Sequence, residues 1–343
     1  MKVINAHNVN EAFDIMVLSL RAHETDSVSS LLEMDSRNGS VLVFDEPLTT
    51  VYRHPKERVL FSPERNCNPF FHFVEALWML DGRNDLKTLT EFAKKMADFS
   101  DDGILVNGAY GYRWREYFGR DQLDEVINRL RVDKQDRRLV LQMWDARKDL
   151  LSPSKDVPCN TQIYFKYRPL TGYDGEVAHL LDMTVTNRSN DLIWGAYGAN
   201  AVHFSVLHEY VATMANLHVG RYYQVSNNAH VYKDIWTPLS KKLPHTVGID
   251  PYRVSNLEPQ RLIDEPEIFD EEVSNFFSWL HEGDSWNRKY YNTIISDTAI
   301  PMVSAWWLYK EQLIDEAIGI AESIKAPDWR KVCVEWLTRR KNK

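Results

Sequence analysis

The stretch Val157-Pro158-Cys159-Asn160-Thr161-Gln162 places a single cysteine between a proline and an apolar, aromatic run at 163–165. The proline fixes the backbone beside the cysteine, and the run after it has the composition of a β-strand. Downstream segments at 187–191, 195–200 and 228–232 supply an arginine, several amides and a His/Tyr pair. A nucleophile before a strand, followed by these groups, indicates a site for a small anionic substrate that forms hydrogen bonds.

The composition bounds the class of protein. The chain has 343 residues, 44% hydrophobic and 26% charged, which suits a soluble globular protein of one large or two small domains. Its net charge of -8 argues against a general nucleic-acid coat. We expect no membrane span and no signal peptide. Three scattered cysteines, Cys67, Cys159 and Cys333, form neither a disulfide framework nor a metal site, which favours a reducing, cytoplasmic setting.

Hydrophobic periodicity gives a coarse outline of the fold. The predicted helices are 9–25, 68–82, 85–99, 121–131, 199–217, 271–281, 308–324 and a short one from 328. The predicted strands are 41–44, 139–144, 161–168, 178–186 and 221–225, with a glycine-containing aromatic loop at 107–114. We predict one α+β domain over residues 1–240, with a helical C-terminal extension over 241–343 packed on it.

Several charged residues are candidates for a site, each with a structural alternative. Glu75 interrupts an apolar helical face, where burial raises the pKa of a carboxyl group and suits it to proton transfer. A salt-bridged structural glutamate is the alternative. Arg37 in a turn, and Arg137 and Arg138 before a strand, have the chemistry to bind phosphate. Solvated turn residues are the alternative for all three.

Taken together, separated motifs resemble the thymidylate synthase family, which includes the pyrimidine nucleotide 5-hydroxymethylases. The matching pieces are Arg37-Asn38-Gly39; Glu75-Ala76-Leu77-Trp78 with Gly82; Tyr110-Gly111 with Trp114-Arg115; Asp136-Arg137-Arg138; Pro158-Cys159; Arg188-Ser189-Asn190-Asp191; Gly195 to Asn200; and Ala229-His230-Val231-Tyr232. Each is weak alone, but their order and spacing make a strong signal. The resemblance implies a mixed β-sheet flanked by helices and a homodimer formed through that sheet.

The resemblance also implies roles for single residues. Cys159 would add as a thiolate to C6 of a pyrimidine ring, which makes C5 nucleophilic, and nearby arginines would lower its pKa. Glu75 would move protons through water, Tyr110 would assist proton removal from C5, and Asn200 would read the base. The implied carbon donor is 5,10-methylenetetrahydrofolate. The expected folate-binding residues are Met96, Trp194 and Gly195.

The implied substrate is a pyrimidine nucleoside 5'-monophosphate. Arg37 and Arg188 would hold its phosphate, and Arg137 and Arg138 would reach the same phosphate from the other subunit. The remaining expected substrate-binding residues are Ser189, Asp191, His230 and Tyr232, the last two at the sugar 3'-hydroxyl. The resemblance requires no metal, membrane or nucleic acid.

Several departures from the synthase pattern bear on how well water is excluded from the site. Asn160 stands where synthases usually carry histidine, and Met96 and Phe99 stand at two tryptophan positions. The chain ends in a basic segment, 339–343, rather than in a short apolar tail that closes the site. A dry site lets the folate deliver hydride and gives a methyl group, whereas a wetter site lets water add and gives a hydroxymethyl group. These departures favour a 5-hydroxymethylase over a thymidylate synthase.

Three questions stay open at the level of sequence. Trp306, Trp307 and Trp329 of the extension are candidates for a lid of its own. The Asn200 amide can donate to uracil O4 and accept from N3-H, which favours dUMP. However, the segment 195–200 is one residue longer than the synthase loop, so dCMP or CMP stays open. The sugar is not decided.

Two rival functions come from other classes. A cysteine hydrolase would use Cys159 with His203 or His230 as its base. A non-catalytic nucleotide or RNA binder would keep the fold alone, but the joint presence of Cys159, Glu75 and Arg188 speaks against it. A hydroxymethylase would fit a pathway that makes modified DNA, as in a bacteriophage, and such an enzyme would work in the host cytoplasm.

Overall fold

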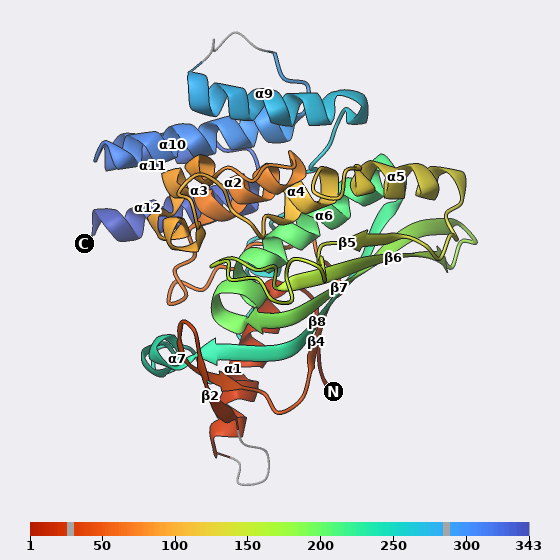
Figure 1. The fold of residues 1–343 in the computed structure, drawn as a ribbon. Helices are drawn as coiled ribbons and strands as arrows, with labels where there is room; N and C mark the ends of the chain where they lie inside the picture. Colours follow the sequence, from red (N-terminus) through yellow and green to blue (C-terminus); the bar gives the residue numbers. More distant parts are fainter. Residues whose placement is uncertain (26–30, 284–288, 343) are drawn as a thin grey trace.

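The computed structural model describes residues 1–25, 31–283 and 289–342, and its centre is one mixed β-sheet (Figure 1). The strand order is β1-β4-β8-β7-β6-β5, with the β2–β3 hairpin attached to β8. The strands are β1 (Lys2–Ala6), β2 (Leu32–Ser36), β3 (Gly39–Val43), β4 (Leu48–Tyr52), β5 (Val140–Gln142), β6 (Asn160–Thr171), β7 (Val177–Asp191) and β8 (His218–Tyr232). The predicted α+β class with a mixed sheet is confirmed.

The sheet brings three chain segments to one end. β7 and β8 run parallel, and their register sets Asp191 opposite His230 at their carboxyl ends. β6 runs antiparallel to β7, with Asn160 opposite Asn187. Cys159, just before β6, therefore lies beside the ends of β7 and β8. The sheet is what gathers residues that are some seventy positions apart in sequence.

Helices complete the chain. They are α1 (Val9–Thr25), α2 (Pro69–Leu80), α3 (Leu86–Phe92), η1 (Lys94–Phe99), α4 (Tyr110–Arg115), α5 (Gln122–Val132), η2 (Leu192–Ala199), α6 (Asn200–Met214), α7 (Lys233–Ser240), α8 (Pro251–Val254), η3 (Pro266–Ile268), α9 (Phe269–Glu282), η4 (Ile295–Ala299), α10 (Ile300–Lys310), α11 (Ile314–Glu322) and α12 (Pro327–Lys341). In Figure 1 they lie mainly to one side of the sheet. No helix in the described ranges is long and apolar enough to span a membrane.

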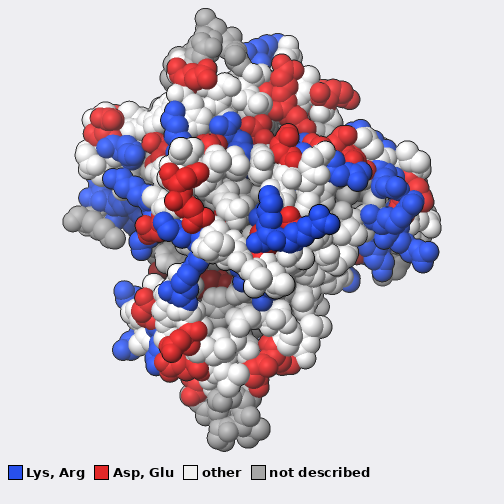
Figure 2. All heavy atoms as spheres, viewed as in Figure 1, with Lys and Arg blue, Asp and Glu red and all other residues white. Residues whose placement is uncertain are grey.

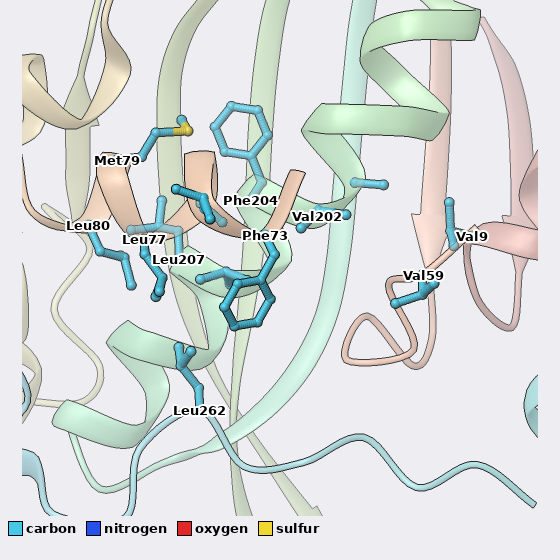
Figure 3. Packing of buried hydrophobic residues seen from close by; sticks show 14 of the residues in the cluster. Val9, Val59, Phe73, Leu77, Met79, Leu80, Val202, Phe204, Leu207 and Leu262 are labelled. Carbon is cyan, nitrogen blue, oxygen red and sulfur yellow. The ribbon is translucent and has the colours of Figure 1, made fainter. Parts of the chain in front are cut away.

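α6 is the central helix of the core, buried along almost its whole length between the sheet and α2. Figure 3 shows Phe73 and Leu77 of α2 close to Phe204 and Leu207 of α6. α2 has the expected terminal signals. Asn68 accepts a hydrogen bond from Phe71 N at its start, and Gly82 adopts a φ of 69° just past its end.

The C-terminal helices pack on α2 through aromatic rings. Phe70 lies 5.6 Å from Trp306 and 5.5 Å from Trp336 between ring centroids, and Phe73 lies 5.0 Å from Trp329. Trp306 and Trp329 are each only 6% exposed, so both fill the core and are not placed as a lid. The extension shares the core of the rest of the chain. Its boundary at residue 240 stays a prediction.

Two predicted helices are interrupted. The helix predicted at 85–99 breaks at Ala93, whose φ of -146° and ψ of 90° are extended, and a 3-10 helix follows. The helix predicted at 308–324 is two helices, because the chain turns at Gln312 with a φ of 65°.

The loop predicted at 107–114 was also wrong, since Tyr110–Arg115 forms α4. Gly111 makes this helix possible by its size. A Cβ at this position would overlap the Met79 carbonyl oxygen, so only glycine lets α4 approach the end of α2 so closely.

The close approach of α4 to α2 gives a stability prediction. Gly111→Ala should lower the free energy of unfolding by about 2–4 kcal/mol, because a Cβ overlaps rigid backbone there. Gly319→Ala is the matched control, since it lies inside helix α11 with no atom within 4 Å of an added Cβ. It should leave stability unchanged or raise it by up to about 1 kcal/mol. Equal denaturation midpoints for the two variants would contradict the packing described.

Candidate active site

The cysteine and an arginine meet at the end of the sheet. The Arg188 backbone N–H donates to the Cys159 carbonyl oxygen at 2.9 Å. The Arg188 side chain donates from Nε to the Pro158 carbonyl and from Nη2 to the Val157 carbonyl, both at 2.9 Å. These bonds hold Nη2 3.9 Å from the Cys159 sulfur. The stretch before the cysteine therefore acts as a clamp that fixes a positive charge beside the thiol.

The groups around the Cys159 thiol shift its pKa in opposite directions. Burial raises the pKa of Cys159, and the carboxylates of Asp156 and Asp191 add to that rise, while Arg188 and Arg37 lower it. The expected lowering by arginines is present, but burial outweighs it. The Cys159 thiol therefore has to lose its proton as it reacts, rather than standing ready as a thiolate.

Tyr110 is a second group at the thiol. Its hydroxyl accepts from Asn160 N at 3.4 Å, and its ring stacks on Phe204 with centroids 5.8 Å apart. Burial, and then the nearby Cys159 and Asp156, raise the pKa of Tyr110. The phenol therefore stays protonated and acts as a hydrogen-bond donor or a relay beside the cysteine.

The ends of β7 and β8 contribute the polar wall. Asp191 accepts a hydrogen bond from Trp194 N and so caps the start of η2. Burial raises the pKa of Asp191, while Trp194 N–H and the neighbouring His230 oppose that rise. His230 Nδ1 lies 3.1 Å from Asn228 Oδ1, which leaves Nε2 for another partner. Ser189 lies opposite Asn228 in the strand register.

Tyr232 and Arg37 approach from the β3 side. Tyr232 lies opposite Val41 of β3, and its ring meets the His230 ring edge-on at 5.6 Å. Arg37, in the β2–β3 turn, donates to the carbonyls of Ser154 (3.1 Å) and Lys155. The hairpin thus reaches the loop that leads into Cys159.

A chain of amides fixes Asn200. Its Nδ2 donates to Asn190 Oδ1 at 3.1 Å, and Asn190 Nδ2 donates to Gln224 Oε1 (3.1 Å) and Ser226 Oγ (3.0 Å). Gly195 packs against this chain, since a Cβ there would lie 2.8 Å from Asn190 Oδ1. This chain fixes the orientation of the Asn200 amide.

The segment before Asn200 departs from regular helical geometry. η2 is divided by a kink at Gly198, whose φ of -120° and ψ of -108° are not helical. Asn200 begins α6, where its interactions are those described above.

Glu75 faces a histidine. Glu75 Oε2 lies 3.1 Å from His203 Nε2, at an angle that forms no hydrogen bond, and both atoms are buried. His72, on the helix of Glu75, lies 6.4 Å from His203 between ring centroids. Burial, His203 and Arg65 hold the pKa of His72 well below its usual value, so His72 is neutral.

Orphaned polar atoms gather in this region. Among the described residues, buried side-chain atoms without a hydrogen-bond partner include Arg65 Nη2, Glu75 Oε2, Asn160 Oδ1, Asp191 Oδ2 and His203 Nε2. Such atoms are costly and call for an explanation. A polar ligand bound among them would supply the missing partners, which supports a binding site at this end of the sheet.

Other predicted site residues lie elsewhere. Arg137 and Arg138 are exposed, ahead of β5, and Arg138 pairs with Asp136 at 2.8 Å. β5 begins opposite Tyr164, and the arginines precede it, so they lie seven to eight strand residues, roughly 25 Å, along β6 from Cys159. They do not join the site of their own chain. Met96 lies in η1 and packs against the core, and its role stays a prediction.

Two functional candidates were missed or misplaced by sequence reasoning. Arg65 donates from Nε to the Ile193 carbonyl (2.6 Å), and its guanidinium stacks 4.1 Å from the half-exposed Trp194 ring. Nothing in its sequence context marks it. His203 was considered only as a hydrolase base, whereas it contacts Glu75. The sequence did contain a signal for His203, because this residue lies one helical turn after Asn200 in an otherwise apolar helix.

Known proteins share these features. A sequence model described as Thymidylate synthase matches residues 64–278. A deoxyuridylate hydroxymethyltransferase of Pseudomonas phage M6 is 43% identical over 353 residues, covering 99% of this chain and 95% of that protein. One of the same name from Bacillus phage SP01 is 38% identical over 199 residues, 55% of this chain and 50% of that protein. A thymidylate synthase of Brachyspira hyodysenteriae is 25% identical over 234 residues, 66% of this chain and 79% of that protein.

The family match covers more than half of the chain, and the relative from Pseudomonas phage M6 aligns along nearly all of it. The matched region contains Cys159 and Arg188, which meet at the end of the sheet, and Glu75 and Asn200, which lie on α2 and α6. The chain therefore belongs to the thymidylate synthase family.

Proposed function

We propose that this protein is a deoxyuridylate hydroxymethyltransferase, which adds a one-carbon unit from 5,10-methylenetetrahydrofolate to C5 of dUMP and completes it with water. The observation that carries the proposal is the 43% identity to the Pseudomonas phage M6 protein of that name along 99% of this chain. The site supports it through Cys159 beside Arg188, and through the unpartnered buried oxygen of Asp191, which lies at the same end of the sheet. The product is 5-hydroxymethyl-dUMP, in the host cytoplasm if a phage encodes the enzyme.

The nucleotide would be held at both ends. Arg188 and Arg37 present positive charge to the 5'-phosphate, and Ser189 lies next to Arg188 on the same strand. His230 Nε2 and the Tyr232 hydroxyl face the sugar. Asp191 has an unpaired buried oxygen beside them, which suits a hydroxyl or N–H donor. Held in this way, C6 of the ring lies over the Cys159 sulfur.

The first chemical steps use the thiol and its neighbours. The Cys159 sulfur adds to C6, its proton leaves, and the electron pair of the C5–C6 double bond moves toward O4. Arg188 stabilises the developing thiolate, because its charge already opposes the effect of burial. Tyr110, beside the thiol, assists the later loss of the C5 proton.

The residues present fit a folate. The Trp194 ring is 51% exposed, and its flat face is braced by the Arg65 guanidinium. The space beside the Gly195 Cα is filled by Asn190 and Asn200, so the exposed Trp194 ring is the surface on which a second ring can stack. When bound, methylenetetrahydrofolate supplies the one-carbon unit. Trp194 and Gly195 orient it against the nucleotide, and Met96 is proposed at its edge.

Water decides the product. The C-terminal helix α12 packs on the body of the protein, where Arg340 donates to Asn66 Oδ1 (3.3 Å). Trp306 and Trp329 are buried in the core and are not placed as a lid. This supports the access of water to the one-carbon unit, and Glu75 is the carboxylate proposed to receive its proton. The alternative, reductive methylation to dTMP, needs a drier site.

A homodimer is proposed from the bare face of the sheet. Val140, Tyr164, Thr184 and Tyr223 form one row across four strands, each opposite the next. They alternate with buried neighbours such as Ile163, so they lie on the face away from the helices. Tyr164 is 40% exposed. The face is mixed, because the neighbours of this row include Gln142, Gln162 and Thr186, and a sheet face that no helix covers suits an interface between two copies. Such an interface would carry Arg137 and Arg138 to the partner's phosphate site.

The proposed anion site rests on two exposed arginines, Arg37 and Arg188, rather than on a broad basic surface. Figure 2 shows basic and acidic side chains interspersed over one face of the molecule, without a single broad basic patch. The arginines that matter for a nucleotide are Arg188 and Arg37, at the thiol. A hydrolase is less well supported, because the polar side chain in contact with the Cys159 sulfur among described residues is a guanidinium and not an imidazole.

The reaction is tested by weighing the product. Incubation with dUMP and methylenetetrahydrofolate should add CH2O to the nucleotide without forming dihydrofolate. Cys159→Ser should lower kcat by a factor on the order of 10³ or more, since the nucleophile is lost. Cys333→Ala, at another buried cysteine in α12, is the control and should stay active. A gain of CH2 with dihydrofolate would instead identify a thymidylate synthase.

Base choice is tested at Asn200. Asn200→Asp should lower kcat/KM for dUMP by about 100-fold or more, because the carboxylate cannot donate to O4. Its oxygens can accept from the cytosine amino group, so the ratio of dCMP to dUMP turnover should rise. Asn216→Asp, exposed beyond the end of α6, should change neither value. Unchanged selectivity in Asn200→Asp would show that Asn200 does not read the base.

Shared sites are tested with mixed dimers. The double variant Arg137→Ala/Arg138→Ala should raise the KM for dUMP in every site, and Cys159→Ser should be inactive. Mixed and re-associated in equal amounts, they should recover about a quarter of wild-type activity, because each mixed dimer contains one complete site. Recovery that stays at the level of the separate variants would place the arginines outside the partner's site.

A further inference from the structure

A buried histidine stands behind the proposed catalytic carboxylate. His203 lies on α6, three residues after Asn200 and therefore on the same helical face. Its side chain is 4% exposed, and Nε2 lies 3.1 Å from Glu75 Oε2 of α2. Both atoms are buried without an aligned hydrogen bond to any described group. Two polar atoms facing each other across a helix–helix contact form a pair only when one donates to the other.

The groups around this pair define its charge. From α2 come Glu75 and His72, and from the segment before α2 comes Arg65. Burial, His203 and Arg65 lower the pKa of His72 well below its usual value, so His72 is neutral. Arg65 is directed to the Ile193 carbonyl and the Trp194 ring. Of the described groups at this contact, Glu75 is thus the acceptor to which His203 Nε2 is closest.

We infer that His203 is a positioning residue for Glu75: its Nε2–H donates to Oε2 and turns Oε1 toward the water that completes the product. The inference rests on the proposed hydroxymethyltransferase activity. The pair sits 3.1 Å apart already, so a small rotation aligns the bond. His203 itself does not touch substrate, because Glu75 lies between them.

The chemistry that this arrangement serves is addition of water. After the one-carbon unit is attached to C5, the covalent intermediate has an exocyclic C5=CH2 bond and a Cys159–C6 bond. Water oxygen bonds to the CH2 carbon, and its proton passes to Glu75 Oε1. The electron pair of the C5=CH2 bond moves toward O4, then returns to form C5=C6 as the C6–sulfur bond breaks. The thiolate leaves, and no external oxidant or reductant is needed.

A base that must act on water needs one oxygen free and aimed. A carboxylate that rotates freely would divide its time between orientations. With Oε2 held by His203, Oε1 is the oxygen that serves water. The early steps at C6 and C5 use Cys159, Tyr110 and Arg188, which His203 does not contact. Loss of His203 should therefore slow the addition of water more than it slows the earlier steps at C6 and C5.

The experiment compares His203→Leu with His203→Gln in the full-length protein. Both fill the space, but only glutamine can donate a hydrogen bond to Glu75. Each is given dUMP labelled with tritium at C5 and methylenetetrahydrofolate, and two rates are measured: tritium release and 5-hydroxymethyl-dUMP formation. His208→Leu is the control, because His208 is a buried histidine of the same helix whose Nε2 bonds the Leu181 carbonyl instead.

In His203→Leu, product formation should fall about 10–100-fold while tritium release falls less than about 3-fold and the KM for dUMP stays near wild type. His203→Gln should restore most of the product rate. His208→Leu should lower the midpoint temperature of thermal unfolding. The ratio of tritium release to product formation should stay at its wild-type value. Equal losses of both rates in His203→Leu, or no rescue by glutamine, would overturn the inference.

The wild-type protein separates this failure from failure of the function. If the wild-type protein forms 5-hydroxymethyl-dUMP and His203→Leu loses tritium release and product formation equally, only the positioning role is wrong. If the wild-type protein forms dTMP or no product, the proposed function is wrong and the role of His203 falls with it. If His203→Leu does not fold, the comparison of His203→Gln with wild type decides, since glutamine should keep the two rates coupled.

Discussion

The parallel pairing of β7 with β8 is the constraint on which this molecule depends. Two parallel neighbours need a crossover connection, and η2 with α6 provides it on the helical side of the sheet. The crossover buries α6 and brings the carboxyl ends of both strands to one edge, where Asp191 meets His230. Antiparallel β6 then delivers Cys159 to the same edge. The site is a consequence of this topology, because strand pairing brings together residues that are far apart in the sequence.

The site region carries part of the energetic cost of the fold. Aromatic side chains close the core where Phe70 and Phe73 meet the C-terminal tryptophans. Around Glu75, Asp191 and His203, polar atoms are buried without partners. Such positions lower stability unless something binds there. A ligand that satisfies them stabilises the folded state and is selected by the same groups.

Sequence alone predicted most of the framework, for physical reasons that can be seen in single elements, and the roles of the site residues stay predictions. α2 has a capping asparagine, a proline at its first turn and a glycine past its end, so its bounds were readable. The resemblance placed Cys159, Arg188 and Asn200 at one site. α4 was missed because its helix depends on the contact of Gly111 with the Met79 carbonyl, which no local pattern carries. The partner of Glu75 was missed for the same reason, since His203 lies 128 positions away on another helix.

The bare face of the sheet carries a consequence for how the protein behaves in dilute solution. If Arg137 and Arg138 complete the site of a second copy, a chain can fold before its active site is complete. Completion of the site then depends on the encounter of two chains. A lone chain would be folded, would hold its thiol beside Arg188, and would still grip phosphate poorly. Activity per chain would then rise with protein concentration, so the amount of enzyme made would set the fraction that works as well as the total.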